Sequence, residues 1–109
     1  MSLAGVEDAR HDLRDAVDEN VGRRPDERRG AAEDGGADAL TVANTFLAMA
    51  IDTDTFKPRI HNITGGLSGP AIRPITLRMV YQCVRVVKIP VIGLGGITKA
   101  EDAVEYFLA

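Results

Sequence analysis

The sequence predicts an α/β fold in which two parallel strands are each followed by a helix. Apolar residues recur at helical spacing over residues 72–87, and an apolar, β-branched run follows directly at residues 89–94. A shorter apolar run at residues 38–42 comes before the periodic segment. The order strand, helix, strand, helix is typical of α/β proteins with a parallel sheet.

The first elements expected are a short helix and a short strand. Residues 27–34 fit the end of a helix that Gly35-Gly36 stops, because glycine adopts the left-handed conformation that ends many helices. Residues 38–42, Asp-Ala-Leu-Thr-Val, then read as a mostly buried strand.

The central helix is the clearest periodic signal in the chain. Its apolar face repeats at i, i+3, i+4 and i+7 and consists of Ile72, Ile75, Thr76, Met79, Val80, Cys83, Val84 and Val87. Pro74 fits the first turn, where a missing N–H costs nothing. Because Cys83 lies on this apolar face, we interpret it as a core residue and not as a nucleophile.

The second strand and the last helix complete the order. Residues 89–94 have the continuous apolar character of a parallel strand covered on both faces. Residues 98–101, Thr-Lys-Ala-Glu, predict a capping box at the start of the last helix. The side chains expected to face inward are Ala100, Ala103, Val104, Phe107 and Leu108.

The N-terminal third has a different character. Residues 1–33 contain nine acids and six arginines but no lysine or aromatic residue, whereas acids and bases balance at seven each afterwards. Such a segment cannot bury enough apolar surface to offset its ordering entropy. We expect residues 1–30 to be a frayed helix or disordered, and their composition also fits a stretch that is not native to the protein.

Bulk properties exclude several classes of function. The net charge of −3 gives no reason to expect a nucleic-acid or membrane-surface partner. The longest apolar run is far shorter than the roughly 20 residues of a membrane helix, and the N-terminus has no signal-peptide pattern. One cysteine fits a reducing compartment, so a cytoplasmic protein is expected. His11 and His61 lack partners at ligand spacing, so no metal site is predicted.

Candidate binding residues lie in the long connection of residues 43–71. Asn44 and Thr45 follow the first strand directly, at the strand end where parallel α/β folds place their sites. Their donors and acceptors suit a planar, amide-rich ligand, although the pair would equally serve to end the strand and start a turn. Residues 64–70, Thr-Gly-Gly-Leu-Ser-Gly-Pro, would let main-chain N–H groups approach a ligand, or would be ordinary turn punctuation.

A second glycine cluster, Gly93-Leu94-Gly95-Gly96, follows the second strand. A strand–Gly-Gly–helix turn is a common cradle for a phosphate or ribityl group, and it is also found without a ligand. Two such turns at adjacent strand ends are more informative than either alone. Asp52 and Asp54 are interpreted as turn formers.

Three runs carry a family resemblance. Residues 31–45 (AAEDGGADALTVANT), 62–74 (NITGGLSGPAIRP) and 89–97 (IPVIGLGGI) closely resemble class 1 dihydroorotate dehydrogenases, most of all the NAD-linked class 1B type. The resemblance covers about residues 31–109, and dihydropyrimidine dehydrogenase carries similar motifs. It implies that this region is a piece of a (β/α)₈ TIM barrel, since a whole barrel needs about 250 residues.

The resemblance also implies an activity and site residues. Such enzymes oxidise dihydroorotate to orotate in pyrimidine biosynthesis, with FMN accepting the hydride. The Asn-Thr pair that binds the pyrimidine corresponds to Asn44 and Thr45. Flavin contacts correspond to Ala43, where a larger aliphatic residue is usual, and to Gly69, Gly95 and Gly96. The 1B type works with a subunit that carries FAD and an iron–sulfur cluster, and exposed strand edges predict a homo-oligomer.

The resemblance implies gaps as well. The family's catalytic cysteine and flavin-binding lysines lie upstream of the matched region, so no catalytic residue is assigned, and we expect no activity from this chain alone. The alternatives are a dihydropyrimidine dehydrogenase-like flavoprotein fragment and a non-enzymatic flavin- or phosphate-binding α/β module.

Overall fold

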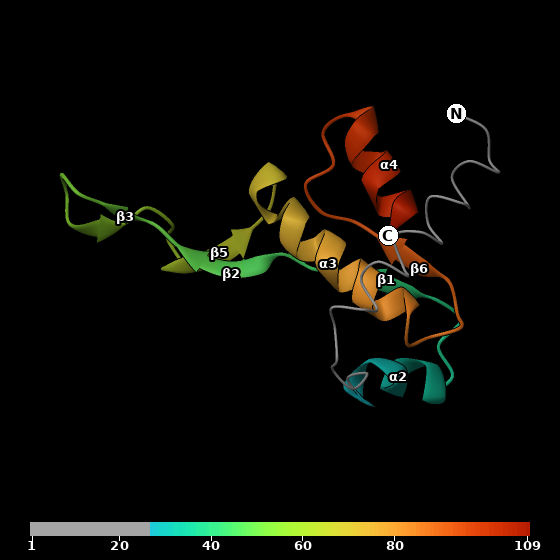
Figure 1. Cartoon of the computed structure of the whole chain (residues 1–109). Helices are drawn as coiled ribbons and strands as arrows, with labels where there is room; N and C mark the ends of the chain where they lie inside the picture. Colours follow the sequence, from blue (N-terminus) through green and yellow to red (C-terminus); the bar gives the residue numbers. More distant parts are fainter. Residues whose placement is uncertain (1–26) are drawn as a thin grey trace.

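The computed structural model describes residues 27–109, and their centre is a parallel strand pair with its helices (Figure 1). Strand β1 (Leu40–Val42) pairs in parallel with β6 (Val91–Gly93), with Leu40 opposite Val91 and Val42 opposite Gly93. Helix α3 (Arg73–Val84) connects them and packs against both strands, and α4 (Ala100–Leu108) follows β6. The predicted strand–helix–strand–helix order and the parallel pairing are confirmed. Both strands are shorter than the apolar runs that predicted them.

Helix α2 (Glu27–Asp34) ends as expected at the glycine pair. The Ala37 N–H donates to the Ala32 carbonyl at 3.0 Å and the Gly36 N–H to the Glu33 carbonyl at 2.9 Å, which is the Schellman arrangement. Gly36 has a φ of 91°, a value that suits glycine best. The Glu33 carboxylate also accepts a hydrogen bond from the Lys88 N–H at 3.0 Å, which ties α2 to the segment before β6.

The core lies where α3 crosses the strand pair. Val42, Val80 and Ala109 are buried together, and Leu40, Leu77, Cys83 and Tyr106 pack against them. Pro74 lies in the first turn of α3, after a short 3₁₀ helix η1 (Pro70–Ile72), and Cys83 is a core-packing residue, as predicted. Two details of the expected apolar face are wrong: Ile75 is 42% exposed, and Val87 is buried but lies beyond the end of the helix at Val84.

Helix α4 does not bury the face that its apolar residues predicted. Val104 and Phe107 are 40% and 70% exposed, and Ala100 is exposed too, whereas Asp102 and Ala109 are buried and Ala103, Tyr106 and Leu108 are partly buried. The capping box of Thr98 and Glu101 is also wrong. The helix begins one residue later, with Lys99 as N-cap, and Asp102 accepts hydrogen bonds from the N–H groups of Thr98 and Lys99. Polar contacts of Asp102 and Tyr106 determine which face of α4 is buried.

The long connection of residues 43–71, for which the sequence predicted no strand, contains an antiparallel β-arm. Strands β2 (Phe46–Met49) and β5 (Thr64–Leu67) pair with each other, and β3 (Ile51–Asp52) pairs with β4 (Lys57–Pro58). The arm reaches away from the strand pair and helices (Figure 1). At its tip Asp52 accepts hydrogen bonds from the N–H groups of Asp54 and Thr55 at 2.9 and 3.0 Å, so its predicted role as a turn former is confirmed. None of the helices within residues 27–109 is long and apolar enough to cross a membrane.

Candidate functional site

The carboxyl ends of β1 and β6 lie side by side and position the first part of the site. Beyond the paired strands, the Leu94 N–H donates to the Val42 carbonyl at 2.7 Å, and the Ala43 N–H donates to the Leu94 carbonyl at 3.3 Å. Ala43 therefore leaves β1 next to the residue that leads into Gly95. This is the edge at which parallel α/β folds collect their binding residues.

Asn44 and Thr45 are both exposed at this edge. The Asn44 Oδ1 accepts a hydrogen bond from the Thr45 N–H at 2.8 Å, so the side-chain carbonyl is partly used within the turn and the amide NH₂ keeps both donors. Thr45 packs directly on Gly66, where a Cβ would lie 2.8 Å from the Thr45 Cβ. This contact joins the Asn-Thr pair to the first glycine cluster.

The two glycine turns meet at Gly69 and Gly96. A Cβ on Gly96 would lie 2.6 Å from the Gly69 carbonyl oxygen and 3.1 Å from the Arg73 nitrogen. Gly69, Gly95 and Gly96 have φ values of 91°, 129° and 70°, in the region that glycine adopts readily. Within the described part of the chain, the Gly96 N–H donates to no protein acceptor. A turn without side chains and with a spare N–H suits a phosphate or ribityl group.

All six residues predicted from the sequence thus belong to one connected region. Ala43 bonds to Leu94, Thr45 packs on Gly66, and Gly96 packs on Gly69. The two glycine turns lie on the same side of the strand pair, as the sequence predicted. Which ligand atoms these residues contact stays a prediction.

Sequence reasoning missed a polar network directly behind the glycine turns. Tyr106 donates a hydrogen bond from its hydroxyl to the Gly95 carbonyl at 2.7 Å, and it also contacts the hydroxyl of Thr76, which is 0% exposed. The sequence pattern places Thr76 only on the apolar face of its helix. The spacing of Asp102, Tyr106 and Ala109 at i, i+4 and i+7 was the available signal for the buried face of α4.

A second part of this network joins the starts of α3 and α4. Arg73 forms an ion pair with Asp102, which is 1% exposed, and its Nε lies 3.4 Å from the Glu105 Oε2. The Asp102 Oδ2 also accepts a hydrogen bond from the Thr98 hydroxyl at 3.0 Å. A buried charge of this kind requires such partners. Because Arg73 contacts Gly96, the ion pair supports the meeting point of the two turns.

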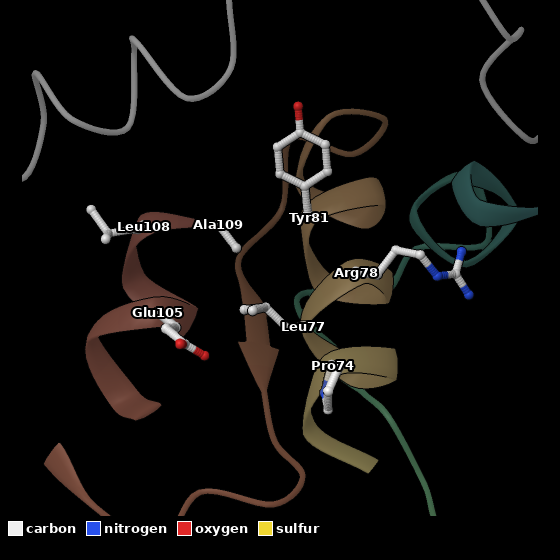
Figure 2. A pocket seen from close by; sticks show the side chains of 7 residues that line it. All are labelled: Pro74, Leu77, Arg78, Tyr81, Glu105, Leu108 and Ala109. Carbon is white, nitrogen blue, oxygen red and sulfur yellow. The ribbon is translucent and has the colours of Figure 1, made fainter. Parts of the chain in front are cut away.

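A groove of about 470 Å³ lies between α3 and α4 (Figure 2) and contains none of the predicted site residues. Its lining comes from α3 and from the C-terminal part of the chain, and Leu77 and Glu105 point into the space between the two helices. Over residues 27–109, no three His, Cys, Asp or Glu side chains group as metal ligands.

The fold and site define a class of protein: a parallel α/β unit that gathers an amide–hydroxyl pair and two glycine turns at its strand ends. The family model for dihydroorotate dehydrogenase matches residues 24–109, and the chain belongs to this family. The NAD-linked dihydroorotate dehydrogenase B catalytic subunit of Maridesulfovibrio salexigens is 63% identical over 78 residues, which are 72% of this chain and 26% of that protein. The subunits of the same name from Caldicellulosiruptor bescii and Brachyspira hyodysenteriae are each 60% identical over 79 residues, again 72% of this chain and 26% of the relative. The chain therefore spans about a quarter of the length of these relatives.

Proposed function

We propose that this chain is part of an FMN-dependent dihydroorotate dehydrogenase, which oxidises dihydroorotate to orotate in pyrimidine biosynthesis. The observation that carries the proposal is the convergence of Ala43 to Thr45, Gly69 and Gly95-Gly96 on one strand edge, in a chain about 60% identical to such catalytic subunits. In this account residues 31–109 form part of a (β/α)₈ barrel.

Asn44 and Thr45 bind the pyrimidine in this proposal. The Asn44 amide donates to ring or carboxylate oxygens through its two N–H bonds, because its Oδ1 already accepts from the Thr45 N–H. The Thr45 hydroxyl donates or accepts beside it. A planar ring with alternating N–H and C=O groups matches this pair. The Thr45 side chain is held in its orientation because it packs on Gly66.

Ala43, Gly69, Gly95 and Gly96 hold the flavin in this proposal. FMN, when bound, supplies the N5 position that accepts a hydride from the substrate. The side-chain-free surface at Gly69 and Gly96 fits a close main-chain approach, and the Gly96 N–H fits an oxygen of the ribityl phosphate. Ala43 offers a smaller contact than the aliphatic residue usual at this position.

In this proposal residues 27–109 do not supply the group that removes the substrate proton. Cys83, the single cysteine, is half-buried on α3 and packs against the core. We therefore expect no turnover by this chain alone. The same observation favours a second candidate function, a non-enzymatic module that keeps only flavin or phosphate binding.

The partners follow from the same proposal. The relatives are named catalytic subunits of NAD(+)-linked enzymes, which supports a separate subunit that carries electrons through FAD and an iron–sulfur cluster. A homo-oligomer fits the open edges of the β1–β6 pair, each strand of which has one partner among the described residues. The reaction belongs to the cytoplasm in this account.

A graft tests the proposal. Residues 31–109 replace the corresponding segment of the Maridesulfovibrio catalytic subunit, which supplies the rest of the barrel. The graft should oxidise dihydroorotate, and Asn44→Ala should lower kcat/KM roughly 10- to 100-fold, since hydrogen bonds to charged groups contribute about 1.5–3 kcal/mol. Asn62→Ala is the matched control, because Asn62 is exposed in the β-arm outside the predicted site. A folded graft that binds flavin but is indifferent to Asn44→Ala would contradict the proposed pyrimidine contact.

A further inference from the structure

Tyr106 links the last helix to the glycine turn by two separate contacts. Its ring lies against Gly93, where a Cβ would come within 2.6 Å of the Tyr106 Cδ1. Its hydroxyl reaches past Gly93 to donate to the Gly95 carbonyl at 2.7 Å. The ring therefore packs α4 against β6, and the hydroxyl orients the Gly95–Gly96 peptide of the turn.

Thr76 supports the Tyr106 hydroxyl from α3. Its side chain is 0% exposed, and its Oγ1 contacts the Tyr106 hydroxyl and lies 3.1 Å from the Arg73 carbonyl. A Cβ on Gly95 would lie 2.8 Å from the Thr76 Cγ2, so the turn rests directly on this threonine. Thr76 thus supports the Gly95 carbonyl through Tyr106 and by its own Oγ1, which lies 3.4 Å from the carbonyl oxygen; these part-buried hydrogen bonds strengthen one another.

The orientation of the Gly95 carbonyl determines where the Gly96 N–H points. The Gly95–Gly96 peptide is trans. In a planar trans peptide the C=O and N–H bonds point in opposite directions. Because the Gly95 carbonyl points toward Tyr106, the Gly96 N–H points away from Tyr106. This N–H donates to no acceptor within the described residues.

Glycine at both positions makes this orientation easy to lose. Two adjacent glycines have many accessible backbone conformations, so the turn does not by itself select the one observed. Two hydroxyls donate to the Gly95 carbonyl and distinguish the observed peptide orientation from its flipped alternative: Tyr106 at 2.7 Å and, more weakly, Thr76 at 3.4 Å.

We propose that Tyr106, supported by Thr76, is a positioning residue that holds the Gly95–Gly96 peptide so that the Gly96 N–H faces the phosphate of a bound flavin nucleotide. The inference rests on the proposed function for its ligand, while the peptide orientation is a property of the chain itself. Tyr106 does not touch the ligand in this account, and it acts through the Gly95 carbonyl.

The first measurement concerns the peptide alone and uses the 109-residue chain without flavin. In Tyr106→Phe, which keeps the ring on Gly93 and removes the hydroxyl, the Gly96 amide resonance should shift, because the Gly95 carbonyl of the same peptide loses its shorter hydrogen bond. Tyr81→Phe is the matched control. The Tyr81 hydroxyl accepts a hydrogen bond from Arg85 at 2.8 Å and makes none with the glycine turn. An unchanged Gly96 amide in Tyr106→Phe overturns the positioning role whatever the chain binds.

The second measurement concerns the ligand and compares FMN with riboflavin, which lacks the phosphate. Tyr106→Phe should weaken FMN binding about five- to tenfold and leave riboflavin binding within about twofold of the unaltered chain. Equal weakening of both flavins would overturn the phosphate assignment, because general loss of structure affects both alike. Failure of the unaltered chain to bind either flavin counts against the proposed function in this chain, whereas the amide measurement still decides the positioning role. Should Tyr106→Phe lose its helical circular dichroism, Thr76→Val must produce the same changes in the same direction, or the proposal fails.

Discussion

At Gly96 the two glycine turns approach so closely that no side chain fits between them. A Cβ there would lie 2.6 Å from the Gly69 carbonyl, and the φ of 70° is unfavourable for other residues. Gly36 has a comparable φ of 91°, but a Cβ there would meet nothing within 4 Å. A side chain at Gly36 would therefore meet backbone strain alone, whereas a side chain at Gly96 would meet backbone strain and steric overlap.

We predict that Gly36→Ala lowers the free energy of unfolding by about 1–2 kcal/mol, the cost of the left-handed conformation. Gly96→Ala should lower it by roughly 2–5 kcal/mol, because overlap with the Gly69 carbonyl adds to the strain. Urea unfolding followed by circular dichroism measures both. Equal losses for the two variants would contradict the close packing of the two turns.

Asp52 makes the tip of the β-arm sensitive to pH. The N–H groups of Thr55 and Asp54, in that order of importance, donate to its carboxylate and lower its pKa below the usual value of 3.8. A lowered pKa means that the carboxylate stabilises the turn fully above the usual value, and that this contribution is lost as the pH falls through the lowered one.

The Asp54 and Thr55 amide resonances should therefore titrate together, with a midpoint below 3.8. Asp52→Asn is the control, because its Oδ1 still accepts both hydrogen bonds but does not titrate. The Thr55 resonance should then lose the transition that Asp52 causes. A midpoint at or above the usual aspartate value would show that the turn does not hold the carboxylate.

Among the elements, α4 shows how polar contacts override an apolar pattern. Its apolar residues predicted that Val104 and Phe107 face inward, yet both are exposed and Asp102 is buried instead. Burial of the Asp102 carboxylate is possible because Arg73 and the start of α4 satisfy it. Once Asp102 and Tyr106 are directed inward, helical spacing turns Phe107 outward.

Asp102→Ala should accordingly destabilise the fold far more than Glu101→Ala. Removing one member of a buried ion pair leaves Arg73 without its main partner, and such changes cost about 3–5 kcal/mol. Glu101 is exposed in the same turn, so its replacement should stay within about 0.5 kcal/mol. Chemical denaturation of the two variants checks the difference. A similar small effect of both would indicate that the pair is not formed in solution.

At the scale of the whole molecule, the parallel unit was predictable and the β-arm was not. Residues 72–87 repeat at the period of a helix, and a continuous apolar run marks β6, so their order was evident. Burial alternates along β2, where Leu47 and Met49 are 80% and 50% exposed and Phe46 and Ala48 are half-buried, but all four residues are apolar. The paired strand β5 contains Gly65 and Gly66. The sequence of the arm therefore lacks the apolar–polar alternation that would have predicted its strands.

The candidate site divides in the same way. Asn44-Thr45 and the glycine turns were found because strand ends and glycines are visible in a sequence. Their meeting at Gly66 and at Gly69 depends on contacts between segments far apart in the chain. Tyr106 was missed because its partner is a main-chain carbonyl, and no residue type signals that acceptor.

The central claim is that residues 31–109 supply the flavin and pyrimidine contacts of a dihydroorotate dehydrogenase without its proton-transfer group. Anaerobic mixing with dihydroorotate, followed by flavin absorbance, tests it most directly. The graft in the Maridesulfovibrio subunit should retain FMN and bleach on adding dihydroorotate, while the 109-residue chain mixed with FMN should not bleach. Bleaching by the chain alone, or a folded graft that retains no flavin, would contradict the account.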